Sequence, residues 1–244
     1  MSEPYVVGVD TGHTCALREA DHLVRALAAE LGLPADVLGC THHVRDGRRP
    51  HTALSFAVPS ERVARAAWRW LTENGSGRPA TGTGTGTIAG TIAGTIAGAG
   101  AGAGEGDGGG GAGGSGAGPD AGTGTLLGVA FGGDRHGPDE LAAGAAHAAA
   151  EHRARTGGRA VLYPGVDALT GVLTVARLLE VSAVDQVAVL GSPGGAAREA
   201  KLVTRDHVRP EWREGRLVLA AMPAVGGTLV PFEVPDPTPC CADH

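Results

Sequence analysis

The sequence predicts an α/β protein. A ferredoxin-like N-terminal unit is interrupted by a disordered Gly-rich insert and is followed by an alternating α/β segment and a C-terminal β-hairpin. The first observation is the order β-α-β-β-α in residues 1–79, which lacks one strand of a ferredoxin-like βαββαβ unit. The second is that Gly, Ala and Thr dominate residues 80–124. The third is that strand and helix patterns alternate within residues 125–234, which favours a parallel α/β layer packing on the first segment.

The first strand and the first helix are predicted from apolar patterning. Residues 5–9 (YVVGV) form an apolar run that is typical of a buried strand. A helix is expected over residues 16–31, and Gly32 and Pro34 end it. Its apolar face is formed at helical spacing by Leu17, Ala20, Val24, Leu27, Ala28 and Leu31.

Two strands and a second helix follow. Residues 37–44 and 52–58 are predicted to be strands around an Asp46-Gly47 turn. Ser60 is a suitable N-cap for the helix after them. The strand that the ferredoxin-like unit still lacks is expected at residues 126–131 (LLGVAF), so that the insert becomes a loop within one domain.

The insert at residues 80–124 contains a Thr-Gly alternation, three copies of Thr-Ile-Ala-Gly and a Gly/Ala tract. Such a segment buries too little apolar surface to offset the entropy lost on ordering, so it is predicted to be disordered. The tetrapeptide repeat is also much shorter than the units of about 20 or more residues from which solenoids are built. A surface loop without a function of its own is the simplest interpretation.

The second segment alternates between helical and strand patterns before it ends in a hairpin. A proline stands in the first turn of its first predicted helix, which is a favoured position. The expected elements are helices at 138–153 and 167–181, strands at 159–163 and 186–190, and a hairpin of 216–221 with 228–234 around Gly226-Gly227.

Composition excludes several classes of protein. The net charge of −6 and the pI of about 5.9 give no electrostatic drive toward duplex DNA. No apolar run approaches the roughly 18 residues of a membrane span, and the N-terminus lacks the pattern of a signal peptide. Two of the four cysteines are adjacent, which argues against a disulfide framework. We therefore expect a cytoplasmic protein with no membrane partner.

The end of the first strand carries the candidate catalytic residues Asp10, Thr11 and His13. The junction between a strand and a helix is where α/β proteins often bind ligands, because free backbone amides point outward there. Asp10 is suited to bind a metal ion or a hydroxyl group. The alternative is that Asp10 and Thr11 only cap the following helix.

A soft-metal site is a further possibility near the same strand. His13 and Cys15 are two residues apart, as are Cys40 and His42, and residues two apart on a strand share a face. If the first two strands pair side by side, four N/S ligands meet in a zinc-type set. The alternative for Cys40 is a small buried apolar residue.

The Pro-rich and Cys-rich tail, residues 235–244, ends in Cys240, Cys241 and His244. Adjacent thiols with a nearby imidazole suit Zn or Cu ions. The tail has too few ligands for a closed site, so it needs His43, His51 or a second chain to complete one. The alternative is an incidental tail.

A glycine-rich turn follows the strand predicted at residues 186–190. It contains the candidate cofactor-binding residues Gly191, Ser192, Gly194 and Gly195, since glycines let backbone amides approach a phosphate closely. The spacing is neither that of a P-loop nor that of a dinucleotide-binding fingerprint. A plain tight turn is the alternative.

Three short motifs in the N-terminal segment resemble a known family. They are Val7-Gly-Val-Asp10-Thr11, Cys40-Thr-His-His43 and Arg49-Pro-His-Thr52. Together they resemble the opening domain of the archaeal agmatinylcytidine tRNA synthetases and their bacterial relatives, over about 60 residues. The family's first strand ends in a pair of aspartates, of which only Asp10 is present here, so the resemblance extends to Asp10 and Thr11. It implies use of Mg-ATP, and tRNA as a partner.

Three functions are therefore open at this stage. The leading one is a nucleotide-handling or phosphate-handling protein that takes a small-molecule or nucleotide ligand near Asp10, Thr11 and His13. The second is a metal-binding or metal-delivery protein whose Cys/His clusters bind Zn or Cu. The third is a scaffold without catalysis. The sequence predicts neither the substrate nor the oligomeric state.

Overall fold

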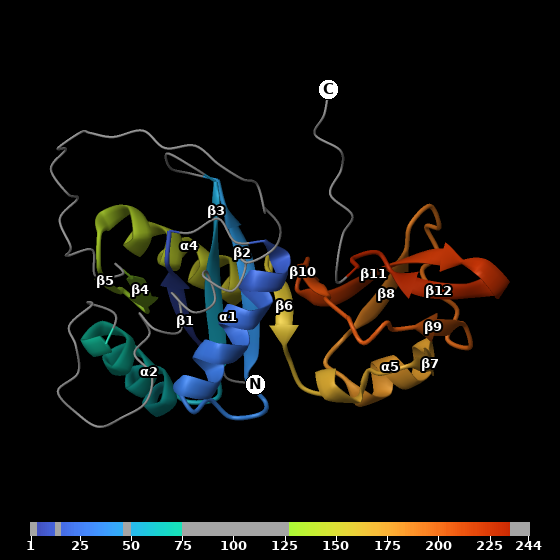
Figure 1. Cartoon of the computed structure of the whole chain (residues 1–244), viewed down its shortest axis with the longest axis horizontal. Coiled ribbons are helices and arrows are strands. Elements are labelled where there is room, and N and C mark those ends of the chain that lie inside the picture. The colour runs from blue at the N-terminus through green and yellow to red at the C-terminus, as the bar shows by residue number, and fades with distance from the viewer. Residues whose placement is uncertain (1–3, 13–15, 46–49, 75–126, 235–244) are drawn as a thin grey trace, which may run out of the picture.

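The computed structural model describes residues 4–12, 16–45, 50–74 and 127–234. Within these ranges it contains four helices and one open mixed sheet of 12 strands, so the predicted α/β class is confirmed (Figure 1). The helices are α1 (Leu17–Glu30), α2 (Glu61–Asn74), α4 (Asp139–Ala154) and α5 (Val175–Val181). The strands are β1 (Tyr5–Asp10), β2 (Leu38–Val44), β3 (His51–Val58), β4 (Gly128–Phe131), β5 (Asp134–His136), β6 (Arg159–Leu162), β7 (Val172–Thr174), β8 (Gln186–Val189), β9 (Lys201–Val203), β10 (Glu211–Arg213), β11 (Arg216–Ala224) and β12 (Thr228–Pro231).

Three of the predictions fall on residues that the structure does not describe. They are the disordered insert at 80–124, the Asp46-Gly47 turn and the tail at 235–244. The absence of a membrane span was also expected. No helix in the described ranges combines the length and the apolar character that crossing a bilayer requires.

The N-terminal strands lie in the order β4-β1-β3-β2, and each neighbouring pair is antiparallel. Along the chain the elements run β1-α1-β2-β3-α2-β4, which is a βαββαβ order. The strand expected at residues 126–131 is present as β4 and pairs with β1. The two central strands are therefore β1 and β3, and β2 lies at the side on which the sheet continues through β6.

Helices α1 and α2 pack on one face of these strands. The 3.6-residue periodicity predicted for the first helix matches the side that α1 buries, which includes Ala20, Val24 and Leu27. Val24 and Leu27 join a core to which β1, β3 and α2 also contribute. Its largest members are Leu23, Leu27, Leu54, Phe56, Leu71, Leu127 and Phe131.

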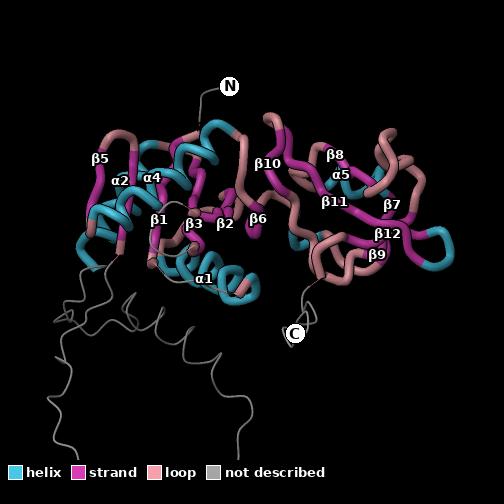
Figure 2. The backbone as a smooth tube through the Cα atoms, turned by 90° about the horizontal axis from the view of Figure 1, so that it is seen from above, coloured by secondary structure: helices cyan, strands magenta, loops and turns pink. Residues whose placement is uncertain are grey.

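Helix α4 packs on the opposite face of the same strands (Figure 2). Its close approach depends on glycines, because a Cβ atom at Gly8 would lie 1.9 Å from the carbonyl oxygen of Ala145. A Cβ atom at Gly128 would lie 2.2 Å from the carbonyl of Leu141. Because these glycines lack side chains, the backbone of α4 lies close to the sheet. The polar residues of α4 are therefore near those of β2 and β3.

The sheet continues beyond β2 through β6, which pairs with β10 at Arg159 and Glu211. Beyond this junction the order is β10-β11-β12-β9-β7, with β8 beside β11 (Figure 1). Among the strands of the described ranges, only the β8–β11 and β9–β12 pairs are parallel. The predicted parallel α/β layer is therefore wrong for most of the second segment, whereas the predicted final hairpin is present as β11 and β12.

The helix predicted at residues 167–181 is also shorter than expected. The α-helix covers Val175–Val181 and a separate 3-10 turn covers Val166–Ala168, while Thr174 caps the α-helix by accepting a hydrogen bond from the amide of Arg177 at 3.2 Å. Gly171 has φ +64°, and after it Val172–Thr174 forms β7 against β9. The apolar residues at helical spacing therefore belong to two different elements, which the periodicity does not separate.

A buried charge network joins the two halves of the sheet. Arg159 on β6 donates to Asp21 on α1 at 2.5 Å, and its Nε donates to Glu233 at 2.5 Å. Arg209 donates to Asp21 at 2.7 Å, and Nε2 of His207 donates to Glu233 at 2.8 Å. Opposite charges paired in this way satisfy one another where water is largely excluded.

Candidate metal centre

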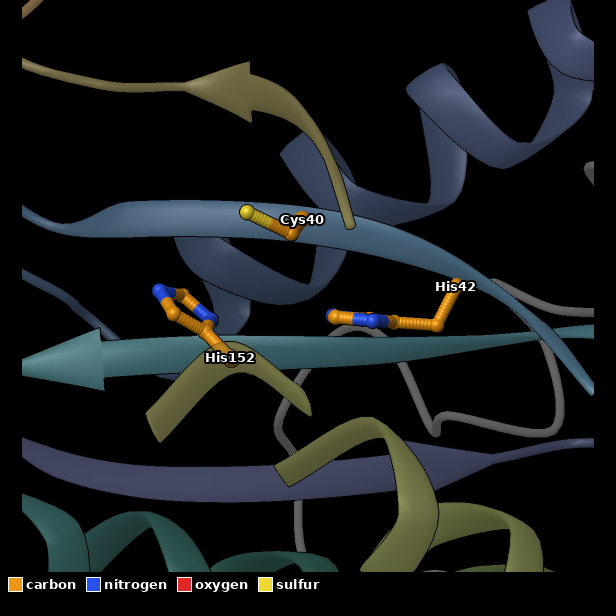
Figure 3. A group of neighbouring side chains, drawn as sticks. All are labelled: Cys40, His42 and His152. Carbon is orange, nitrogen blue, oxygen red and sulfur yellow. The ribbon is translucent and has the colours of Figure 1, made fainter. Parts of the chain in front are cut away.

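One strand and one helix bring Cys40, His42 and His152 together between the sheet and α4 (Figure 3). Cys40 and His42 are two residues apart on β2 and share the face that α4 covers, while α4 itself supplies His152. One ligand atom of each residue, the thiol sulfur and two ring nitrogens, lies within 4.8 Å of the others. All three side chains are buried, with exposed fractions of 0% to 3%.

A chain of hydrogen bonds runs through this group from Glu151 to His152. Nδ1 of His42 donates to Oε2 of Glu151 at 2.9 Å, and Nε2 of His42 lies 2.7 Å from Oγ of Ser55. The same Oγ lies 2.6 Å from Nδ1 of His152. Ser55 stands opposite Cys40 in the β2–β3 register, so its hydroxyl reaches the middle of the group.

The protons of this chain follow from the donors and acceptors available. Burial lowers the pKa of His42, so the ring is neutral and its one N–H goes to the Glu151 carboxylate. Nε2 of His42 therefore accepts from the Ser55 hydroxyl. That hydroxyl has a single hydrogen, so it accepts from Nδ1–H of His152. Nε2 of His152 is left with a free lone pair, and burial lowers the pKa of His152 to about 3, so this ring is neutral too.

The thiol of Cys40 is inert as long as no cation is near. Burial raises the pKa of Cys40 well above its usual range, while the Trp212 indole and the charge of Arg159 lower it. Among the described residues, Nε1 of Trp212 is buried and makes no hydrogen bond of ordinary geometry. The indole and the charge of Arg159 thus act in favour of a thiolate, the form of cysteine that binds metals, although burial opposes them.

Gly158 fixes one side of the His42 ring. A Cβ atom at this position would lie 2.4 Å from Cε1 of His42, and the residue has φ +106°, where side chains are disfavoured. The Cε1 side of the imidazole therefore lies close to the backbone of the segment that leads into β6. This contact and the hydrogen bond to Glu151 hold the ring from two sides.

A pocket of about 510 Å³ opens beside the group. His42 and Glu151 form part of its wall, and the remaining polar lining includes Arg45, His147 and Glu211. Cys40, Ser55 and His152 do not line it. The Glu151 end of the hydrogen-bond chain is thus open to solvent, whereas the His152 end and the nearby Cys40 are closed off from it.

Both carboxylate oxygens of Asp10 accept hydrogen bonds from inside the protein. Its Oδ1 accepts from the amide of Gly12 at 2.7 Å, and its Oδ2 accepts from Nε2 of His51 at 2.8 Å. Burial raises its pKa despite these bonds. It is not the cap of the next helix, because α1 begins after Ala16, whose amide donates to Glu19. Neither Asp10 nor Thr11 lines the pocket beside His42.

The predicted four-ligand set requires the first two strands to pair, and they do not. β3 lies between β1 and β2 and pairs antiparallel with both of them. His13 and Cys15 lie outside the described residues, as do Cys240, Cys241 and His244 of the tail. Of the predicted ligands, the structure brings together Cys40 and His42.

The glycine-rich turn lies far from this group, beyond β8. Gly191 and Gly195 have φ values of +78° and +71°, and the amide of Ser192 donates to Val189 at 3.0 Å. The amide of Ala196 likewise donates to Val187 at 3.1 Å. These amides hold the turn together, and the binding of a phosphate by Gly191, Ser192, Gly194 and Gly195 stays a prediction.

The sequence interpretation missed Ser55, Glu151 and His152. One signal was present, since His147, Glu151 and His152 form an H-x-x-x-E-H pattern on a predicted helix, where residues four apart share a face. Its relation to Cys40 depends on which face of the sheet the helix covers, and spacing along the chain does not give that.

The fold and the site define a class only, an α/β protein with a buried thiol and two buried imidazoles at one point. Comparison of the chain with protein-family models, with curated proteins and with solved structures finds no match.

Proposed function

We propose that the protein binds a transition-metal ion through Cys40, His42 and His152. The observation that carries the proposal is the convergence of one sulfur and two ring nitrogens within 4.8 Å in a buried site. One thiolate and two imidazoles form a ligand set that suits Zn²⁺ and copper. Since all three side chains are buried, the ion would be held in a site with little access to water.

The surroundings of the ligands support this function. Glu151 fixes the tautomer and the orientation of His42, as a carboxylate does for the zinc-binding histidines of many proteins. Both imidazoles are neutral, so Nε2 of His152 offers a lone pair to a cation, and Nε2 of His42 offers another once the Ser55 hydroxyl turns away from it. A bound cation would also stabilise the thiolate of Cys40.

A nucleophilic enzyme is the closest competing interpretation, because Glu151, His42 and Ser55 follow the order of an acid–base–nucleophile triad. A nucleophile must reach its substrate. The Ser55 side chain has no exposed surface, and its oxygen is held by both imidazoles. The geometry therefore favours a structural or metal-linked hydroxyl over a nucleophile.

Nucleotide handling stays a prediction. Both carboxylate oxygens of Asp10 are engaged inside the protein, and no contact of the described residues favours a nucleotide at this position. Its test is calorimetric titration of the protein with Mg-ATP. Binding that Asp10→Asn removes would support this function, and an absence of heat at saturating concentrations would contradict it.

The metal-binding function is tested in a single-thiol protein, the full chain with Cys15→Ser, Cys240→Ser and Cys241→Ser. In this background Cys40 is the only thiol, because the chain contains four cysteines. The protein is purified without a His tag, incubated with Zn²⁺ and freed of excess ion before elemental analysis. We expect one tightly held zinc ion, which Cys40→Ala removes.

The second ligand is tested with His152→Ala and His152→Asn, the latter because an amide nitrogen still donates to Ser55 when an imidazole is absent. Both variants should lose the ion. His22→Ala is the matched control, since His22 is exposed on α1 and far from the site. A zinc ion that persists in folded Cys40→Ala and His152→Asn proteins would refute the proposed function.

A further inference from the structure

We propose that His147 and Glu151 form a second, solvent-accessible metal-binding site that captures the ion on its way to the buried centre. The existence of this outer site is independent of the proposed function, whereas the transfer of the ion rests on it. The outer site is made from residues of α4 that face the pocket beside His42.

The geometry of the pair is suited to a divalent ion. His147 and Glu151 are four residues apart on α4, so both side chains leave the same face of the helix. Nε2 of His147 lies 3.6 Å from Oε1 of Glu151, far enough for both atoms to bind one ion without touching. Zn²⁺ takes one nitrogen and one oxygen ligand of this kind at about 2.0–2.2 Å.

The accessibility of this pair distinguishes it from the buried centre. The side chains of His147 and Glu151 are 43% and 32% exposed, whereas that of His42 has no exposed surface. Both residues line the same pocket of about 510 Å³, so solvent water can complete the coordination of an ion there. A site with two protein ligands is expected to bind weakly and to exchange its ion quickly.

Glu151 connects the outer site to the inner one. Its Oε1 faces His147, and its Oε2 accepts the hydrogen bond from His42. The next residue along α4 is His152, a ligand of the buried centre. An ion on the outer pair is therefore one side chain away from the inner ligands. Movement of this one carboxylate would both release the ion and free the ring of His42.

The experiment uses Co²⁺ with the single-thiol protein, because thiolate-bound cobalt absorbs in the near ultraviolet and cobalt held by nitrogen and oxygen does not. Stopped-flow absorbance measures how fast the thiolate band appears, and calorimetry counts the bound ions. We expect two binding events in the parent protein. His147→Ala should remove the weaker event and slow the band about tenfold, with its final amplitude unchanged.

His22→Ala serves as the control and should leave both readouts unchanged. If His147→Ala binds as many ions and gains the band as fast as the parent, the pair is only a helix-surface ion pair and the inference is wrong. If the parent never develops a thiolate band, the proposed function fails. The outer site is then judged separately, by whether His147→Ala removes the remaining binding event.

Discussion

Nδ1 of His42 donates a hydrogen bond of 2.9 Å to Glu151, although the two residues are 109 positions apart in the chain. This bond leaves Nε2 of His42 directed at Ser55, in the buried group that also contains Cys40 and His152. A carboxylate that orients an imidazole in this way raises its basicity as a ligand. Glu151 therefore acts on the metal centre through His42.

Glu151→Gln should weaken zinc binding at the buried centre by about 10–100-fold, because outer carboxylates of this kind contribute that much to metal affinity. The amide retains the shape of the side chain but not its charge. The measurement is competition with a chelator of known affinity. Glu180→Gln on the exposed side of α5 is the control. An unchanged affinity in Glu151→Gln would show that Glu151 does not act on the metal through His42.

Much of the N-terminal fold could be predicted from the sequence, since it rests on local periodicity. The helical spacing of Ala20, Val24 and Leu27 and the apolar run at residues 126–131 both correspond to observed elements. The helix boundaries and strand directions of the second half could not be predicted in this way. Gly171 breaks the expected helix at positive φ, and long-range pairing decides which strands run parallel.

The candidate site was predictable only in part. Cys40 and His42 share a face because they are two apart on a strand, which spacing alone gives. Ser55 and His152 are 97 positions apart, and they meet because α4 covers the face of the sheet opposite α1. Nothing in the local pattern of α4 specifies that face.

Gly158→Ala should impair both folding and metal binding. The added Cβ atom would lie 2.4 Å from the ring of His42, and the backbone at φ +106° is unfavourable for alanine. We expect a loss of about 1–3 kcal/mol in the free energy of unfolding, the usual range for overpacking. Urea unfolding and zinc titration measure the two effects. Gly133→Ala, which would meet no atom within 4 Å, is the control.

A normal zinc affinity in Gly158→Ala would mean that the position of His42 does not limit binding. A lower free energy of unfolding with a normal zinc affinity would mean that the substitution strains only the backbone. The expected result, with both quantities reduced, agrees with a displaced ring of His42.

Gly144→Ala should destabilise the protein without direct contact with the metal centre. Its Cβ atom would lie 1.8 Å from Oδ2 of Asp10, the oxygen that accepts from His51. The substitution therefore either breaks a buried hydrogen bond or pushes α4 off the sheet, at a cost of at least about 2 kcal/mol. Thermal unfolding measures it against Gly194→Ala, where the space is open. Equal melting temperatures would contradict the packing described here.

The charge network around Glu233 should make the protein acid-sensitive. Arg159 and His207 hold the pKa of Glu233 at about 2, below its ordinary value of 4.5, although burial opposes them. The unfolded chain therefore takes up this proton first as the pH falls. The stabilisation is complete above pH 4.5 and decreases toward pH 2, by up to about 3 kcal/mol. Urea unfolding at pH 6 to 3 should show a steeper loss for the parent than for Glu233→Gln, with Glu180→Gln as the control. Parallel curves for the parent and Glu233→Gln would exclude Glu233 as the source.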